Sequence, residues 1–80
     1  MEPLYFKTVR GQAVPVSIVE IYSENNIPYY VLKVKRNRSP YKAGETVTAL
    51  PNHLVTKSGR VNITAYIERD KPVIHPGVII

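Results

Sequence analysis

Apolar and polar side chains alternate over much of this chain, which is typical of strands with one face in a core and the other in water. Residues 29–35 show this alternation, with Tyr30, Leu32 and Val34 on one face, and residues 60–68 show it most cleanly. Both segments are therefore predicted to be strands. The side chains expected to point inward in the second segment are Val61, Ile63, Ala65 and Ile67.

Two earlier segments are also predicted to be strands. Residues 4–9 are short and rich in β-branched and aromatic side chains. Residues 14–22 alternate at first and then become apolar on both faces, so this strand is long, partly covered on each side, or bulged. Pro15 cannot donate a hydrogen bond to a neighbouring strand, which predicts a sheet edge or a bulge at that position.

A tight turn is predicted between the second and third strands. The connecting residues Ser23–Asn26 include two asparagines, and asparagine tolerates the positive φ that two-residue hairpin turns require. We therefore expect residues 16–22 to pair antiparallel with residues 27–35.

The second half of the chain adds shorter elements. Residues 46–49 alternate and form a further predicted strand, whereas Pro51–Val55 is long enough for one helical turn only. Residues 73–74 are expected to form a short closing strand. Five or six short strands with turns between them predict a single all-β domain over residues 1–80, a small antiparallel barrel or sandwich.

One short motif resembles a known family. Pro51-Asn52-His53-Leu54-Val55 is similar in spacing to the P-x-N-Y-V sequence that forms a one-turn helix between the last two strands of SH3 domains. The chain has no tryptophan and no A-L-Y-D-Y sequence. The resemblance therefore implies an architecture, a five- or six-stranded SH3-like barrel with one helical turn near Pro51–Val55, and not the groove for proline-rich peptides.

The chain is basic, because eleven Lys and Arg stand against six Asp and Glu and give a formal net charge of +5. Such a charge favours nucleic acid, an acidic protein surface or an anionic membrane as partner, and it is also a common aid to solubility. The absence of cysteine fits a reducing compartment. Since Glu2, Lys7 and Arg10 interrupt any N-terminal apolar run, we expect a cytoplasmic protein with no membrane partner.

Positive charge is concentrated in residues 33–42, which we call the basic tongue. No carboxylate occurs between Glu24 and Glu45. Lysine and arginine neutralise phosphates, and aromatic neighbours stack on bases. The sequence thus predicts an accessory or regulatory protein that binds DNA or RNA with low sequence specificity; the alternative is a solvated sheet edge. The candidate contacts are Lys33, Lys35, Arg36, Arg38 and Lys42, with Tyr29 and Tyr41 as stacking residues.

Catalytic and metal-binding patterns are weak. His53 and His75 are the only histidines, lie in separate segments and have no cysteine to complete a metal site. No serine lies in a G-x-S-x-G sequence, and the four glycines are isolated, so neither a nucleophile nor a phosphate-binding loop is indicated. We expect no enzyme activity and neither a metal nor another cofactor.

A protein-interaction module, acting as adaptor or inhibitor, is the alternative function. Tyr66 is predicted to be exposed, and the apolar tail Val78–Ile80 is expected to close the core or to join a second chain in a homodimer. An acidic protein partner would use the basic tongue. Salt separates the two functions, because nucleic-acid binding weakens steeply as salt rises while docking on apolar surface tolerates it.

Overall fold

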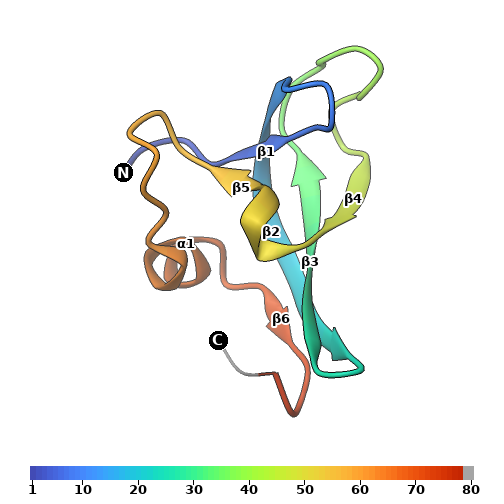
Figure 1. Cartoon of the computed structure of the whole chain (residues 1–80), viewed down its shortest axis with the longest axis vertical. Coiled ribbons are helices and arrows are strands. Elements are labelled where there is room, and N and C mark those ends of the chain that lie inside the picture. Colours follow the sequence, from blue (N-terminus) through green and yellow to red (C-terminus); the bar gives the residue numbers. More distant parts are fainter. Residues whose placement is uncertain (79–80) are drawn as a thin grey trace.

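A long antiparallel hairpin forms the centre of the molecule, whose structure is a computed structural model that describes residues 1–78 (Figure 1). It consists of β2 (Ala13–Glu24) and β3 (Ile27–Val34). The turn between them holds Asn25 and Asn26 at φ values of 54° and 64°, as a two-residue hairpin turn requires. The predicted pairing and the predicted turn are both confirmed.

Four short strands complete the sheet around this hairpin. β1 (Tyr5–Lys7) pairs with the first part of β2, β4 (Thr46–Ala49) pairs with β3, and β5 (Leu54–Val55) pairs with β1, all antiparallel. The strand order is β4-β3-β2-β1-β5, and β6 (Val73–Ile74) pairs in parallel with β2. The all-β fold is confirmed, although the short closing strand runs parallel to its neighbour.

A one-turn 3₁₀ helix, η1 (Pro51–His53), connects β4 to β5. Proline is well placed at its start, because the first amides of a helix have no partner inside the helix. The turn ends where Leu54 N donates to Pro51 O. This is the position, between the last two strands of the five-stranded path, that the resemblance to SH3 domains implies.

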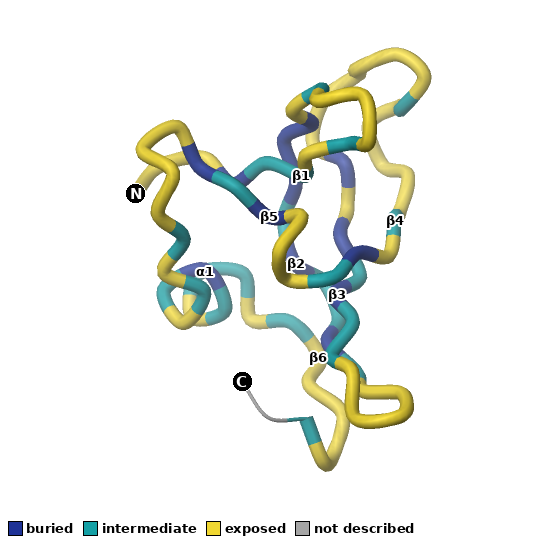
Figure 2. The backbone as a smooth tube through the Cα atoms, viewed as in Figure 1, coloured by how far each residue is buried: buried dark blue, intermediate teal, exposed yellow. Residues whose placement is uncertain are grey.

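β2 changes the face that it buries partway along its length. Its even-numbered apolar residues up to Ile18 point into the core, whereas Ile21 does so further on. Val19 is the extra residue of a β-bulge, since the pairing with β3 shifts between Ile18 and Glu20. Of the possibilities that the alternation left open, both the long strand and the bulge are observed, since β2 has 12 residues and its pairing shifts once. Buried positions are dark blue along the backbone in Figure 2. Outside β2, the buried apolar side chains are Leu4, Tyr30, Leu32, Val34, Ala49, Leu54 and Tyr66.

Pro15 lies inside the sheet, so the prediction that it marks an edge or a bulge is wrong. It pairs with Tyr5 of β1, and its carbonyl oxygen accepts a hydrogen bond from Lys35 N at 2.9 Å on the other side. β3 ends at Val34. The regular ladder therefore stops just where proline offers no donor, which is why the residue is tolerated there.

The strand predicted at residues 60–68 is also wrong, because the chain forms helix α1 (Ile63–Asp70) there. Asn62 caps the helix, and its Oδ1 accepts a hydrogen bond from Ala65 N at 3.3 Å. Lys71 ends the helix in the left-handed conformation, with a φ of 49°. Both ends of α1 are thus set by local polar chemistry that the alternation of apolar residues does not reveal.

The face of α1 that packs on the sheet follows helical spacing. Ile63, Tyr66 and Asp70 are three or four residues apart and so lie on one side. Tyr66, predicted to be exposed, is only 3% exposed, and its hydroxyl donates to Glu2 O at 2.6 Å. The Arg69 guanidinium lies 4.8 Å from the centre of the Tyr66 ring. The helix therefore holds the N-terminal segment and Arg69 in place.

Asp70 ties the end of α1 to the bulge of β2. Its carboxylate accepts a hydrogen bond from Ile18 N at 2.9 Å and pairs with Arg69 at 2.7 Å. Burial would raise the pKa of Asp70, but the hydrogen bonds from Arg69 and Ile18 and the charges of Arg69 and Lys35 together hold this pKa below its ordinary value of 3.8. The ionised carboxylate is therefore the form that stabilises the fold.

We predict that Asp70→Asn lowers the free energy of unfolding at neutral pH by about 1–3 kcal/mol, because it removes a charged hydrogen-bond acceptor. A carboxyl group with a lowered folded-state pKa stabilises the protein above its unfolded-state pKa. This contribution is lost as pH falls through the folded-state pKa. In urea denaturation, the difference between Asp70→Asn and wild type should therefore shrink below pH 3.8.

The exposed neighbour Glu68 supplies a matched control. Glu68→Gln removes one negative charge from the same helix and should change stability by less than about 0.5 kcal/mol at either pH. A difference between Asp70→Asn and wild type that stayed constant down to the lowest pH would contradict the role assigned to the carboxylate.

Candidate functional site

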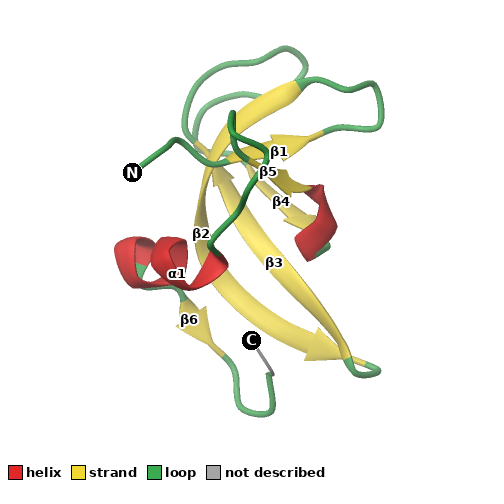
Figure 3. Ribbon diagram, turned by 60° about the vertical axis from the view of Figure 1, so that its left-hand side comes forward, coloured by secondary structure: helices red, strands yellow, loops and turns green. Residues whose placement is uncertain are grey.

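The basic tongue begins at the end of β3 and continues into the loop that links β3 to β4. It lies beside the β1–β2 loop at one end of the molecule (Figures 1 and 3), and Gln12 Nε2 of that loop donates to Ser39 O at 3.0 Å. Arg38 and Tyr41 form an isolated bridge in which each backbone N–H donates to the other carbonyl oxygen, at 2.8 and 2.6 Å. The Arg38–Tyr41 bonds close the tip of the tongue on itself, and the Gln12 bond holds that tip against the β1–β2 loop.

Three of the predicted phosphate contacts meet at one hollow of about 250 Å³, which we call the basic hollow. Lys35, Arg36 and Arg38 approach it from the tongue, and Arg69 approaches it from α1. Arg69 was not among the predicted contacts, since it directly follows the segment that was predicted to be a strand. The remaining walls are formed by Met1, Pro3, Leu4, Tyr5 and Pro15.

The positive charge of the basic hollow is only partly neutralised. Arg69 pairs with Asp70, and the hydrogen bond to that carboxylate raises the pKa of the guanidinium more than its burial lowers it. The other close contact between a basic and an acidic side chain within residues 1–78 joins His75 to Glu20. Within the described part of the chain, the tongue cations therefore have no acidic side chain in salt-bridge contact.

The remaining predicted contacts do not share the basic hollow. Lys33, the first residue of the tongue, is exposed on β3, and Lys42 is exposed at its other end; neither lines the basic hollow. Tyr29 stacks on Tyr22, with ring centres 5.5 Å apart and planes at 23°. It lies four residues before Lys33, roughly 13 Å away along the strand. The structure thus gathers part of the predicted set and leaves Tyr29 outside it.

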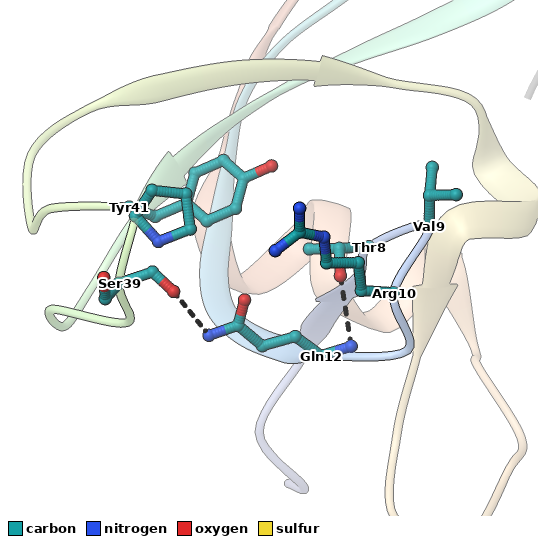
Figure 4. A pocket seen from close by; sticks show the side chains of 7 residues that line it. Thr8, Val9, Arg10, Gln12, Ser39 and Tyr41 are labelled. Atoms are coloured by element: carbon teal, nitrogen blue, oxygen red, sulfur yellow. Dashed lines mark hydrogen bonds between the residues drawn. The ribbon is translucent and has the colours of Figure 1, made fainter.

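Tyr41 belongs to a second hollow of about 620 Å³, which we call the Tyr41 hollow (Figure 4). Its half-buried ring packs edge to face on Phe6, with centres 6.1 Å apart. Arg10 of the β1–β2 loop lines the same hollow and was not among the predicted contacts, since nothing in the sequence links that loop to the tongue. The other lining residues are Thr8, Val9, Gln12, Ser39 and Pro40.

The two histidines have separate surroundings. The His53 ring lies 6.2 Å from that of Phe6, while His75 Nε2 contacts Glu20 Oε1. Among the residues that the structure describes, no three His, Asp or Glu side chains are grouped so as to hold a metal ion.

The C-terminal tail lies partly outside the described residues. Val78 is half-buried against the core, whereas Ile79 and Ile80, which were predicted to join the core or a second chain, are not described. Neither helix within residues 1–78 has the length or apolar character needed to cross a bilayer.

Comparison with known proteins gave no match: no family model, no curated protein and no solved structure matches this chain. The basic hollow presents guanidinium and ammonium donors to an anion, and the Tyr41 hollow presents an aromatic ring beside a guanidinium. Residues of the basic tongue line both hollows.

Proposed function

We propose that this protein is a small nucleic-acid-binding accessory or regulatory protein that docks through its basic tongue. The observation that carries the proposal is the basic hollow, where Lys35, Arg36 and Arg38 meet Arg69 with no acidic partner for the tongue cations within residues 1–78. Phosphate oxygens would supply the missing negative charge, and arginine presents a planar fork of donors that fits them.

The proposed binding has low sequence specificity for a physical reason. Contacts between cations and phosphates position a protein on nucleic acid but carry no sequence information. A small protein also offers little surface for reading base edges in a groove. A cytoplasmic location without enzyme activity belongs to the same proposal, and the absence of cysteine supports that location.

We predict that the double variant Arg36→Ala, Arg38→Ala binds unrelated nucleic-acid sequences about tenfold more weakly than wild type and by a similar factor for each sequence. Both side chains are exposed, so the fold should persist. Fluorescence anisotropy titrations with two oligonucleotides of unrelated sequence provide the measurement.

The matched control is Lys57→Ala, Arg60→Ala, which removes the same charge from exposed positions that line neither hollow. Its affinity should fall much less. Unchanged affinity in the Arg36, Arg38 variant, or an equal loss in the control, would show that the tongue is not the contact surface.

A protein partner is the second candidate function, and one observation favours it. Ile27, Val73 and Ile74 are exposed apolar side chains on strands away from the tongue. Tyr66 no longer supports this function, because it is buried. An adaptor or inhibitor that docks through these residues would hold its partner at high salt, whereas a nucleic acid held by the tongue would dissociate.

A further inference from the structure

The Tyr41 hollow has the volume of a ligand site. Its volume of about 620 Å³ falls within the range of roughly 300–1,000 Å³ that is usual for small-molecule pockets. Tyr41 and Arg10 approach it from two different loops (Figure 4). An aromatic ring and a guanidinium are the two planar groups on which nucleic-acid bases stack in proteins.

The polar groups around this hollow are partly occupied. Gln12 Nε2 donates to Ser39 O, and Gln12 N donates to Thr8 Oγ1 at 3.1 Å (Figure 4). The bond to Ser39 O joins the two loops, whereas the bond to Thr8 Oγ1 lies within the β1–β2 loop. The side-chain oxygen of Gln12 is left as an acceptor. Arg10 forms no ion pair within residues 1–78. The hollow therefore offers both donors and an acceptor around an apolar ring, which suits the mixed edge of a base.

The tongue pairs a cationic residue with Tyr41 through the backbone. Arg38 and Tyr41 face each other in an antiparallel bridge, and such partners have Cβ atoms roughly 5 Å apart on the same side of the ladder. Arg38 lines the basic hollow while Tyr41 lines the other one. A single nucleotide can thus meet both residues, with its phosphate at Arg38 and its base at Tyr41.

We infer that the protein prefers single-stranded nucleic acid, and that the Tyr41 hollow receives one unstacked base while Arg38 holds the adjoining phosphate. This inference rests on the proposed function and adds the class of nucleic acid to it. In a duplex, each base is paired and stacked, so its ring face is closed to a protein side chain. A single strand exposes that face without the cost of opening a helix.

A comparison of two single-stranded probes tests the inference on the unaltered protein. One is a short oligothymidylate, and the other is an abasic strand of the same length and phosphate count. Anisotropy titrations of wild type should show about tenfold tighter binding to oligothymidylate, the size of effect that stacking of one base on an aromatic ring gives. A thymidine–adenine duplex of that length should bind more weakly than the single strand.

Single substitutions test whether the base lies in the Tyr41 hollow. Tyr41→Leu keeps an apolar side chain against Phe6 but removes the ring, and it should bind both single strands alike. Arg10→Ala, at an exposed loop position, should reduce the preference for oligothymidylate, whereas Arg60→Ala, which removes the same charge elsewhere, should preserve it. Circular dichroism of each variant checks that it is folded.

The possible outcomes distinguish the inference from the proposed function. If wild type binds oligothymidylate and the abasic strand equally, or binds the duplex more tightly, the inference is overturned while docking on phosphates stands. A preference that survives in folded Tyr41→Leu also overturns it, because the base then lies elsewhere. Binding to none of the probes removes the proposed function together with the inference.

Discussion

Reversing the charge of Arg36 and Arg38, in the variant R36E/R38E, is expected to lower the affinity for any nucleic acid by on the order of a hundredfold. Both side chains line the basic hollow, so the substitution removes two phosphate donors and places two carboxylates against the backbone of the nucleic acid. Like charges in contact cost far more than a missing contact. Anisotropy titration at low salt measures the loss.

The matched variant K57E/R60E separates this local effect from a general effect of net charge. Either variant replaces two positive side chains by two negative ones, which lowers the formal charge from +5 to +1. Only R36E/R38E places the change at the basic hollow. Equal losses in the two variants would mean that affinity follows net charge alone, and the tongue would have no special role.

The Tyr66→Ala variant is expected to lose roughly 3–5 kcal/mol of stability, which is the usual cost of truncating a buried aromatic side chain. Tyr66 is almost fully buried, packs in the core and donates a hydrogen bond to Glu2 O. For a domain of this size such a loss is comparable with the whole free energy of unfolding. Urea denaturation followed by circular dichroism should show a largely unfolded protein.

Tyr66→Phe serves as the graded control. It keeps the ring and loses only the hydroxyl, so about 1 kcal/mol should be lost through the missing hydrogen bond. The variant should remain folded and bind nucleic acid as wild type does, since Arg69 keeps its ring contact. If Tyr66→Ala were as stable as Tyr66→Phe, the buried Tyr66 ring would not be the contact that holds α1 against the sheet.

The hairpin at the centre of the fold is predictable because its sequence repeats one short period. Residues of β3 alternate between core and solvent, and the two asparagines between β2 and β3 accept positive φ. The bulge is also visible in the sequence, because the apolar positions of β2 change from even-numbered residues to Ile21, and these are the residues that the structure buries. Local rules of this kind need no knowledge of the rest of the chain.

Helix α1 was not predicted because its sequence fits both the two-residue period of a strand and the spacing of a helix. Apolar residues at every second position from Val61 to Ile67 indicate a strand, yet Tyr66 and Asp70 complete a helical face. The decisive contacts are distant: Asp70 reaches Ile18 N, and the Tyr66 hydroxyl reaches Glu2 O. Asn62, a favourable N-cap residue, was the available local clue.

The site was partly predictable for the same reason. The tongue cations follow one another in the chain, so their clustering is visible in the sequence. Arg69 and Arg10 reach the two hollows from remote elements, and no short-range pattern points to them. Tyr29 shares a strand with Lys33 but lies toward the other end of the hairpin, where it stacks on Tyr22.

The salt dependence of wild-type binding tests the central claim most directly. If Lys35, Arg36 and Arg38 each neutralise one phosphate, the logarithm of the association constant for a single strand should fall against the logarithm of salt concentration with a slope of about −2. Oligonucleotides of unrelated sequence should share that slope. An affinity that stays constant as salt rises, or no measurable binding at low salt, would contradict the account.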